Sequence, residues 1–234
     1  MIRGDGRPLD SMRPVRITAG VSPYAEGSAL CAFGRTEVLC AASLEEGVPP
    51  FLEGRGSGWV TAEYAMLPRA THTRTEREHM HGGRAQEISR LIGRSLRAAA
   101  DLKALDNYTI RVDCDVLVAD GGTRTAAISG GLVALAQALA KLGQKPACPV
   151  AAVSVGKLAG RILVDLSYEE DAAAEVDCNL VLTQDGRLVE VQATAEKGLF
   201  SPQDLGAMLQ AGMAAAGGIF AAQRAALAAA GGSA

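Results

Sequence analysis

Aromatic residues and metal-binding motifs are scarce in this chain. Phe, Trp and Tyr make up 4% of its 234 residues, while 48% of the residues are hydrophobic. We therefore expect a core built from Ala, Leu, Val and Ile. The five cysteines are scattered and form no CxxC or Cys/His cluster. This pattern disfavours a zinc site, and it favours a reducing, intracellular compartment in which the cysteines are small core residues.

Long apolar runs and a strong excess of one charge are also missing. No window approaches about 18 uncharged apolar residues, so no membrane span and no membrane partner are expected. Charged residues occupy the first positions, where a signal peptide needs an apolar stretch. The formal charge of −3 comes from 23 basic and 26 acidic residues, so any nucleic-acid site must be a local basic patch. These features predict a soluble, cytoplasmic α/β protein.

Segments with strand and helix patterns alternate along the chain. Alternating polar and apolar residues predict a strand over 109–118, and apolar residues spaced by three and four predict helices over 85–102 and after Ile128. Further strands are expected at 28–33, 36–42, 59–65, 151–155, 161–166, 176–183 and 187–193. A last helix begins near Pro202 and is expected to break at Gly217-Gly218. We therefore expect an α/β (α+β) fold of mixed sheets covered by helices, in a single domain over 1–234 with an extended arm at 1–14.

A glycine-rich segment connects the predicted strand 109–118 to the next helix. It reads Ala119-Asp-Gly-Gly-Thr-Arg-Thr125. Glycines let the backbone approach a ligand, and the free N–H groups of a helix start attract anions. Arg124 adds a forked donor that matches phosphate oxygens. The spacing and lysine of a P-loop are absent, which disfavours nucleotide hydrolysis. From these residues alone, a plain turn and an anion-binding loop are equally good interpretations.

Basic side chains gather between Pro68 and Arg84, where no regular period is visible. Four arginines and all three histidines of the chain lie there: Arg69, Arg74, Arg77, Arg84, His72, His79 and His81. No carboxylate or cysteine completes a familiar metal-ligand spacing among the histidines, which disfavours a metal site. The two open interpretations are a solvated loop and a local patch that contacts nucleic-acid phosphates.

An acidic cluster precedes the predicted strand 176–183. It runs Glu169-Glu-Asp171 and then Glu175-Val-Asp177. Neighbouring carboxylates can hold Mg²⁺ together with substrate phosphates, or they can transfer protons. A charged surface loop is the simpler interpretation of the spacing, unless the cluster faces the arginines.

Taken together, these segments resemble the ribonuclease PH family, the phosphate-dependent 3′→5′ exoribonucleases that trim tRNA precursors. The similar motifs are collinear along nearly the whole chain. They are Arg3-Gly-Asp-Gly-Arg7, Val48-Pro-Pro-Phe51, Gly58-Trp-Val-Thr-Ala-Glu-Tyr64, Met66-Leu-Pro-Arg-Ala-Thr71, Gly83-Arg84 with Gln86-Glu-Ile88 and Arg90-Leu-Ile-Gly-Arg94, Asp113-Cys-Asp115 with Ala119 to Thr125, and Tyr168-Glu-Glu-Asp171 with Asp177.

The resemblance implies roles for individual positions. Arg84, Gly122, Thr123 and Arg124 would bind the attacking inorganic phosphate. Asp171 and Asp177 would be catalytic and tied to a divalent cation such as Mg²⁺. The basic positions Arg69, Arg74 and Arg77 would contact RNA.

The resemblance also implies a reaction and an assembly. Phosphate would attack the last phosphodiester of a tRNA precursor or another structured RNA 3′ end, release a nucleoside 5′-diphosphate, and run in reverse as nucleotidyl transfer. The family forms a hexameric ring built as a trimer of dimers. Two alternatives are a catalytically silent ring subunit that guides RNA in an exosome-like assembly, and a phosphate-binding enzyme of small metabolites. The presence of Arg84, Arg124, Asp171 and Asp177 favours the active enzyme.

Overall fold

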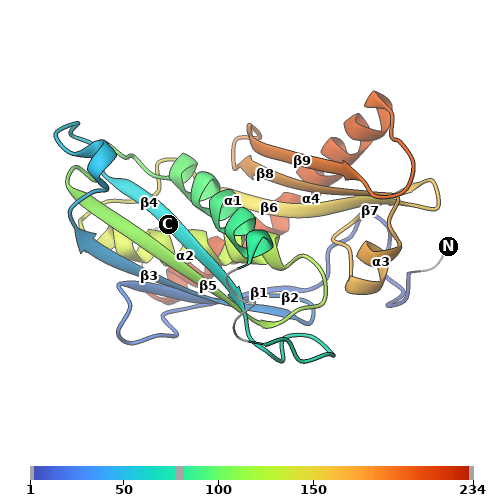
Figure 1. Cartoon of the computed structure of the whole chain (residues 1–234), viewed down its shortest axis with the longest axis horizontal. Coiled ribbons are helices and arrows are strands. Elements are labelled where there is room, and N and C mark those ends of the chain that lie inside the picture. The colour runs from blue at the N-terminus through green and yellow to red at the C-terminus, as the bar shows by residue number, and fades with distance from the viewer. Residues whose placement is uncertain (1–2, 77–81, 232–234) are drawn as a thin grey trace.

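Two β-sheets organise the molecule (Figure 1). The structure, a computed structural model, describes residues 3–76 and 82–231. The first sheet, sheet A, has the order β1-β2-β3-β5-β4, and its strands are antiparallel except for the parallel pair β4 and β5. Its strands are β1 (Val15–Ala19), β2 (Gly27–Phe33), β3 (Thr36–Glu46), β4 (Trp59–Met66) and β5 (Tyr108–Val118).

The second sheet, sheet B, is antiparallel throughout and has the order β7-β6-β8-β9. Its strands are β6 (Val150–Leu158), β7 (Arg161–Val164), β8 (Val176–Thr183) and β9 (Leu188–Ala195). The helices are α1 (Gly83–Ala99), α2 (Thr123–Lys141), α3 (Tyr168–Ala173) and α4 (Pro202–Ala229), and a 3₁₀ turn, η1, covers Pro50–Leu52. This arrangement is the predicted fold class of mixed sheets covered by helices.

Helix α2 is the centre of the packing. It contacts β2 and β3 of sheet A and also β6 of sheet B, while α1 packs against β4 and α2. Most of its residues are buried around the whole circumference. A helix enclosed in this way needs apolar or small side chains on every face. The alanines, glycines and leucines of its sequence meet that requirement.

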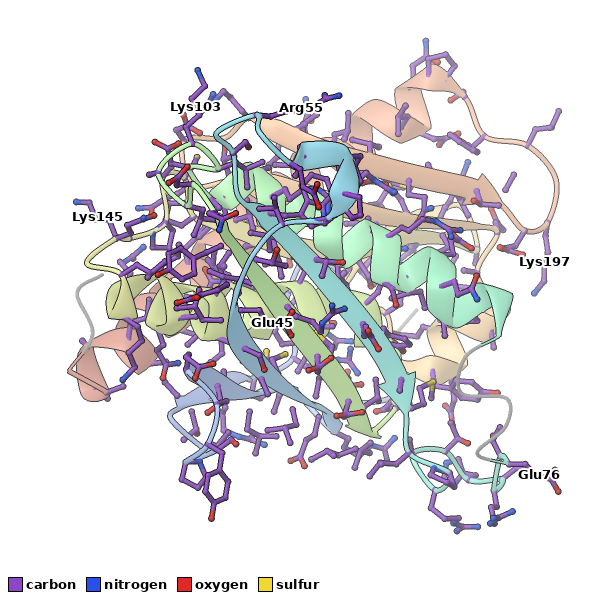
Figure 2. The ribbon with its side chains drawn as sticks, turned by 60° about the vertical axis from the view of Figure 1, so that its left-hand side comes forward. Glu45, Arg55, Glu76, Lys103, Lys145 and Lys197 are labelled. Atoms are coloured by element: carbon purple, nitrogen blue, oxygen red, sulfur yellow. The ribbon has the colours of Figure 1, made fainter. Side chains whose placement is uncertain are left out.

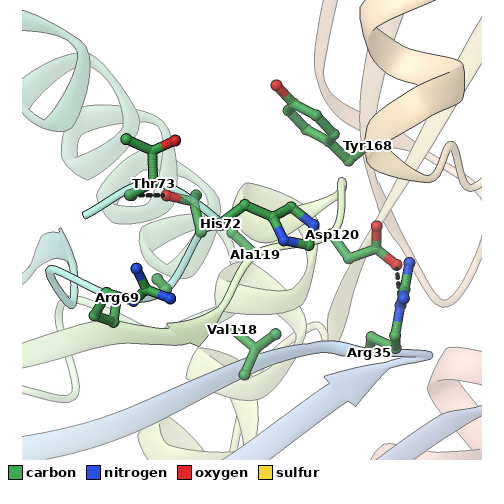
Figure 3. A pocket seen from close by; sticks show the side chains of 10 residues that line it. Arg35, Arg69, His72, Thr73, Val118, Ala119, Asp120 and Tyr168 are labelled. Atoms are coloured by element: carbon green, nitrogen blue, oxygen red, sulfur yellow. Dashed lines mark hydrogen bonds and ion pairs between the residues drawn. The ribbon is translucent and has the colours of Figure 1, made fainter. Parts of the chain in front are cut away.

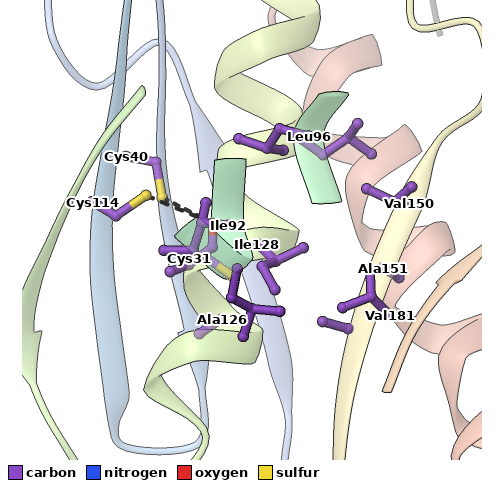
Figure 4. Packing of buried hydrophobic residues seen from close by; sticks show 14 of the residues in the cluster. Cys31, Cys40, Ile92, Leu96, Cys114, Ala126, Ile128, Val150, Ala151 and Val181 are labelled. Carbon is purple, nitrogen blue, oxygen red and sulfur yellow. Dashed lines mark hydrogen bonds between the residues drawn. The ribbon is translucent and has the colours of Figure 1, made fainter. Parts of the chain in front are cut away.

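One continuous core joins the two sheets. Figure 4 shows Ile92 and Leu96 of α1 and Ile128 of α2 between the sheets, with Val150 of β6 and Val181 of β8 beside them. All five side chains are buried. The stripe predicted for α1 is confirmed, because all its members are buried: Ile88, Leu91, Ile92, Leu96 and Ala99.

Four of the five cysteines are small core residues, as predicted, and Cys148 is not. Cys31, Cys40, Cys114 and Cys178 are buried free thiols, and Cys148 is half-buried. Cys40 and Cys114 are register partners on β3 and β5. Burial raises the pKa of the Cys178 thiol to about 12, so this side chain is a neutral apolar group at physiological pH.

Charged side chains of both signs surround the core. Figure 2 shows exposed examples that project from loops and strand ends in several directions: Glu45, Arg55, Glu76, Lys103, Lys145 and Lys197. The small net charge is therefore spread over the surface. A site for a polyanion must depend on a local grouping of arginines.

The structure corrects several predicted boundaries. Strand β6 continues to Leu158, so the hairpin turn is confined to Ala159 and Gly160. The first part of the acidic cluster, Glu169 to Asp171, forms α3 instead of a loop, because Ser167 and Glu170 make a capping box at its start. Glu175 follows this helix, and Asp177 lies on β8. Helix α4 runs through Gly217-Gly218 without a break. Flanking alanines favour the helix, and Ala216, Ile219 and Phe220 pack in the core, which offsets the cost of two glycines.

Helix α4 also corrects the expectation about long apolar segments. By length and composition alone it could cross a membrane, since its most apolar 18-residue window has a mean hydropathy of 1.5. One face of the helix, however, packs against β6, β7 and β1. On that face Gln223 is buried and donates hydrogen bonds to the carbonyl oxygens of Ser129 (2.9 Å) and Val150 (3.0 Å). These contacts bury one face of the helix in the core, while 28% of the apolar window is buried in all.

Two glycines of α4 provide a test of this packing. A Cβ at Gly212 would collide with Leu180 and press on Val155, whereas a Cβ at Gly217 would meet open space. We expect Gly212→Ala to lower the free energy of unfolding by about 1–3 kcal/mol through overpacking. Gly217→Ala should raise it by about 0.5–1 kcal/mol, because alanine favours the helix. Urea denaturation measures both, and equal effects of the two substitutions would contradict the packing described.

Candidate active site

A two-glycine turn leads from β5 into α2. Gly121 and Gly122 have φ values of +78° and +68°, in the left-handed region that glycine tolerates best. A Cβ at Gly121 would also collide with the carbonyl oxygen of Leu166. The turn therefore depends on glycine at this position. It leaves the first N–H groups of α2, at Thr123 and Arg124, without partners inside the helix.

A cavity of about 150 Å³ lies in front of this helix start. Arg84 reaches it from the first turn of α1, Asp171 from α3 and Asp177 from β8. All six residues for which the sequence predicts phosphate-binding or catalytic roles line it: Arg84, Gly122, Thr123, Arg124, Asp171 and Asp177. Asp171 and Asp177 of the acidic cluster therefore face the arginines. This arrangement favours a chemical role for the cluster over a plain surface loop.

Two carboxylates share this cavity. Burial and the neighbouring charge of Asp171 raise the pKa of Asp177 to about 6, and Arg124 and Asn179 only partly offset this. Burial likewise raises the pKa of Asp171, against the opposing effect of Arg124 and Arg84. The pair therefore favours a proton or a cation beside it. Within the described residues, no group of three His, Cys, Asp or Glu side chains could hold a metal.

The two arginines are held differently. Arg124 is half-buried, and its Nη1 donates to Oε1 of Gln192 on β9 at 3.0 Å. Gln192 in turn donates to Glu87 of α1 at 3.1 Å, so this chain of contacts orients the guanidinium of Arg124. Arg84 is exposed at the start of α1. The positive charges of both guanidinium groups act to lower the pKa of Asp171. The cavity therefore contains positive charge as well as the two carboxylates.

Sequence reasoning missed several residues of the cavity. Asn179 is buried and donates to both carboxylate oxygens of Asp177, at 3.3 and 3.1 Å. The period of two in a strand places Asn179 on the same face as Asp177, so this contact was open to prediction. The hydroxyl of Tyr64 lies 2.8 Å from that of Thr123. These two residues are distant in sequence, and no local pattern connects them.

The N-terminal arm fixes the position of the glycine turn. Arg13 is buried and pairs with Asp165, with Nη2 to Oδ1 at 2.7 Å and Nε to Oδ2 at 2.9 Å. The same guanidinium donates to the carbonyl oxygens of Asp120, Gly121 and Leu166. It therefore joins the turn before α2 to the segment that leads into α3. Arg3 adds a contact to Glu170 of α3 at 2.6 Å.

One of the arginines expected to contact RNA, Arg69, lies beside this cavity. Arg69 lines a second cavity, of about 410 Å³, which shares Thr71, Ala119 and Tyr168 with the first. Arg74 is exposed on the same loop. Arg77 lies outside the described residues, as do His79 and His81. Of the three arginines expected to contact RNA, the described part therefore contains Arg69 and Arg74.

Comparison with known proteins identifies the family. The model of the 3′ exoribonuclease family, domain 1, matches residues 11–140, and the model of domain 2 matches residues 148–215. Ribonuclease PH from Mycobacterium avium (strain 104) is 57% identical over 236 residues, covering 96% of this chain and 91% of that protein. This chain belongs to the 3′ exoribonuclease family. Ribonuclease PH from Mycolicibacterium gilvum (strain PYR-GCK), 55% identical with the same coverage, agrees.

These relatives make the protein a phosphate-dependent 3′→5′ exoribonuclease, as the sequence predicted. Solved structures share the fold of this exoribonuclease. Rrp46 from rice (Oryza sativa) has a TM-score of 0.82 and 24% identity, covering 96% of this chain and 100% of that one. The Archaeoglobus fulgidus exosome with RNA bound to its active site has a TM-score of 0.80 and 23% identity, covering 91% and 89%. The two family models divide the chain between its two sheets, and the single-domain description stays a prediction.

The buried pair of Arg13 and Asp165 provides a test of what holds the site together. Burial alone would raise the pKa of Asp165, but its hydrogen bonds and ion pair with Arg13 outweigh this and lower it. Asp165→Asn should cost about 3–5 kcal/mol of unfolding free energy at neutral pH, because Arg13 loses its counter-charge. A lowered pKa means that the pair stabilises above the ordinary aspartate pKa of about 4 and is lost as the pH falls through the folded value.

The difference between wild type and Asp165→Asn should therefore shrink in acid. Denaturation curves at neutral pH and below about pH 4 measure it. Asp185→Asn, which breaks the exposed pair with Arg187, serves as the control and should have a much smaller effect. A difference that is independent of pH would show that Asp165 does not stabilise the fold through its charge.

Proposed function

We propose that this exoribonuclease trims the 3′ ends of tRNA precursors and other structured RNAs, and that it releases nucleoside 5′-diphosphates. The observation that carries the proposal is the shared cavity. It combines two guanidinium groups, a helix N-terminus and a pair of carboxylates. A reaction between two anions, inorganic phosphate and a phosphodiester, needs this combination of charges in one place.

The glycine turn and the two arginines would hold the attacking phosphate. The N–H groups at the start of α2 supply donors of partial positive charge, and Arg124 and Arg84 supply full charges. Gln192 keeps Arg124 oriented through its 3.0 Å contact. Because the phosphate then replaces water as the nucleophile, the bond formed resembles the bond broken. The reaction is therefore reversible when nucleoside diphosphates are abundant.

Asp171 and Asp177 would act on the leaving side. The bond cleaved leaves a 3′-oxygen on the shortened RNA, and this oxygen takes up a proton. The raised pKa of Asp177, about 6, suits it to hold that proton near neutral pH. Two carboxylates that also repel each other fit Mg²⁺, which binds one or two carboxylates together with substrate phosphates. When bound, Mg²⁺ would neutralise charge at the scissile phosphate.

The wider features of the proposal follow the family resemblance. Arg69, Arg74 and Arg77 would contact RNA phosphates, and the protein would work in the cytoplasm, without a membrane partner, as a hexameric trimer of dimers. The archaeal structure with RNA bound at its active site supports RNA entry on this fold. A silent, RNA-guiding ring subunit is the alternative. The presence of Arg84, Arg124, Asp171 and Asp177 in one cavity argues for the active enzyme.

The assignment of the phosphate site is tested with RNA and a variant of Arg124. Purified protein incubated with a tRNA that carries extra 3′ nucleotides should release nucleoside diphosphates only when phosphate and Mg²⁺ are present. Arg124→Ala should lower kcat/KM for phosphate by about 10²–10³-fold, as expected when a charged donor is removed from an anion site. RNA retention should largely survive.

Arg187→Ala is the control for this prediction. Arg187 lies in the turn between β8 and β9, whereas Asp177 lies near the start of β8. Arg187 pairs with the exposed Asp185. It should leave phosphorolysis unchanged. Release of nucleoside monophosphates by the wild type would reject the proposed chemistry, and equal losses of RNA binding and phosphorolysis in Arg124→Ala would reject its assignment to phosphate.

A contact of Arg69 with RNA can be tested separately. Arg69 is exposed and has no ion-pair partner among the residues described. If it contacts an RNA phosphate, Arg69→Ala should weaken binding uniformly across RNA sequences. It should also reduce the slope of log K against log salt by about 0.7, the value for one counterion released from a single strand. An unchanged slope in binding measurements from low to moderate salt would mean that Arg69 is merely solvated.

A further inference from the structure

The second cavity, lined by Arg69, lies directly beside the phosphate cavity. It is larger, at about 410 Å³ against about 150 Å³, and the two share Thr71, Ala119 and Tyr168. A chain held by its last phosphodiester in the smaller cavity would have neighbouring sugar and base groups to accommodate. The shared residues place the larger cavity next to that position.

The lining of this second cavity combines apolar surface with a basic rim. Tyr168 is 57% exposed and Val118 is 40% exposed, although both are large hydrophobic residues. Figure 3 shows the side chains that line this cavity, with Tyr168 at the upper right, His72 near the centre and Arg69 at the left. Arg35 is already paired with Asp120 at 3.0 Å. Arg69 is exposed and has no such partner among the described residues, so its guanidinium is a candidate to bind an anion.

The position of Tyr168 is set by the catalytic segment. It is the first residue of α3, and Asp171 follows three residues later, on the same side of the helix. The capping box of Ser167 and Glu170 and the contact of Arg3 with Glu170 hold this helix start in place. The backbone that carries both Tyr168 and Asp171 is therefore held in place, three residues apart on one short helix.

We propose that the second cavity receives a nucleobase next to the scissile phosphodiester, and that Tyr168 is the surface on which this base stacks. The inference rests on the proposed phosphorolysis of RNA. An aromatic ring and a guanidinium that line the same cavity can bind a single-stranded nucleotide. The base stacks on the ring, and the phosphate binds the cation. Every base has an aromatic face, so this contact positions the 3′ end without selecting its sequence.

Stacking on Tyr168 is tested by removing either the ring or the base. Tyr168→Ala should lower kcat/KM for RNA by about 5- to 100-fold, the range for the loss of one stacked base. The KM for phosphate should not change. Tyr168→Phe, which keeps the ring, should retain wild-type values. Tyr24→Ala, at a tyrosine that is 95% exposed in the β1–β2 connection, serves as the control and should have no effect.

The decisive comparison uses RNAs that are abasic at the terminal or at the penultimate nucleotide. One of these substrates should react equally with wild type and Tyr168→Ala, and its position identifies the stacked base. If Tyr168→Ala loses as much on both abasic substrates as on normal RNA, or loses nothing on normal RNA, stacking is rejected. Failure of the proposed function would look different, because the wild type would then release no nucleoside diphosphate from any RNA.

Discussion

The buried ion pair of Arg13 and Asp165 is the interaction on which the geometry of the site depends. Asp165 lies just before the segment that carries Asp171, and Arg13 also binds carbonyl oxygens of the turn that starts α2. One guanidinium thus sets the separation between the phosphate-binding turn and the carboxylates. A buried charge is costly unless it is fully paired. Arg13 has two carboxylate oxygens and three carbonyl oxygens as acceptors, which meets this cost.

The phosphate cavity balances charges that are individually unfavourable. Burial raises the pKa of both carboxylates, and the charge of Asp171 raises that of Asp177 further. Arg124 opposes both shifts and Arg84 opposes that of Asp171, without forming close ion pairs in the described structure. A site that is not internally neutralised by salt bridges keeps its donors available for phosphate oxygens and its carboxylates available for a proton or cation. Gln192 and Asn179, which carry no charge themselves, orient Arg124 and Asp177 through hydrogen bonds.

The fold also explains why two cavities lie side by side. Strand β5 ends at Val118 in the larger cavity, and the turn that follows leads at once into the smaller one. Tyr168, at the start of α3, borders both. A single rigid junction of strand, turn and short helix therefore presents an apolar surface to a base and a polar surface to a phosphate, a few residues apart.

Local sequence patterns predicted most of the strands and helices and part of the chemistry of the site. Periodicity identified the buried stripe of α1, and the glycine turn with Arg124 indicated an anion site, because both signals lie within a few residues. The meeting of Arg84, Arg124, Asp171 and Asp177 was inferred from family resemblance, and only tertiary packing places them in one cavity. Arg13, Tyr64 and Tyr168 were missed as parts of the site for the same reason. Their partners are far away in the chain, and contacts at such separation depend on how the sheets and helices pack, which no local pattern encodes.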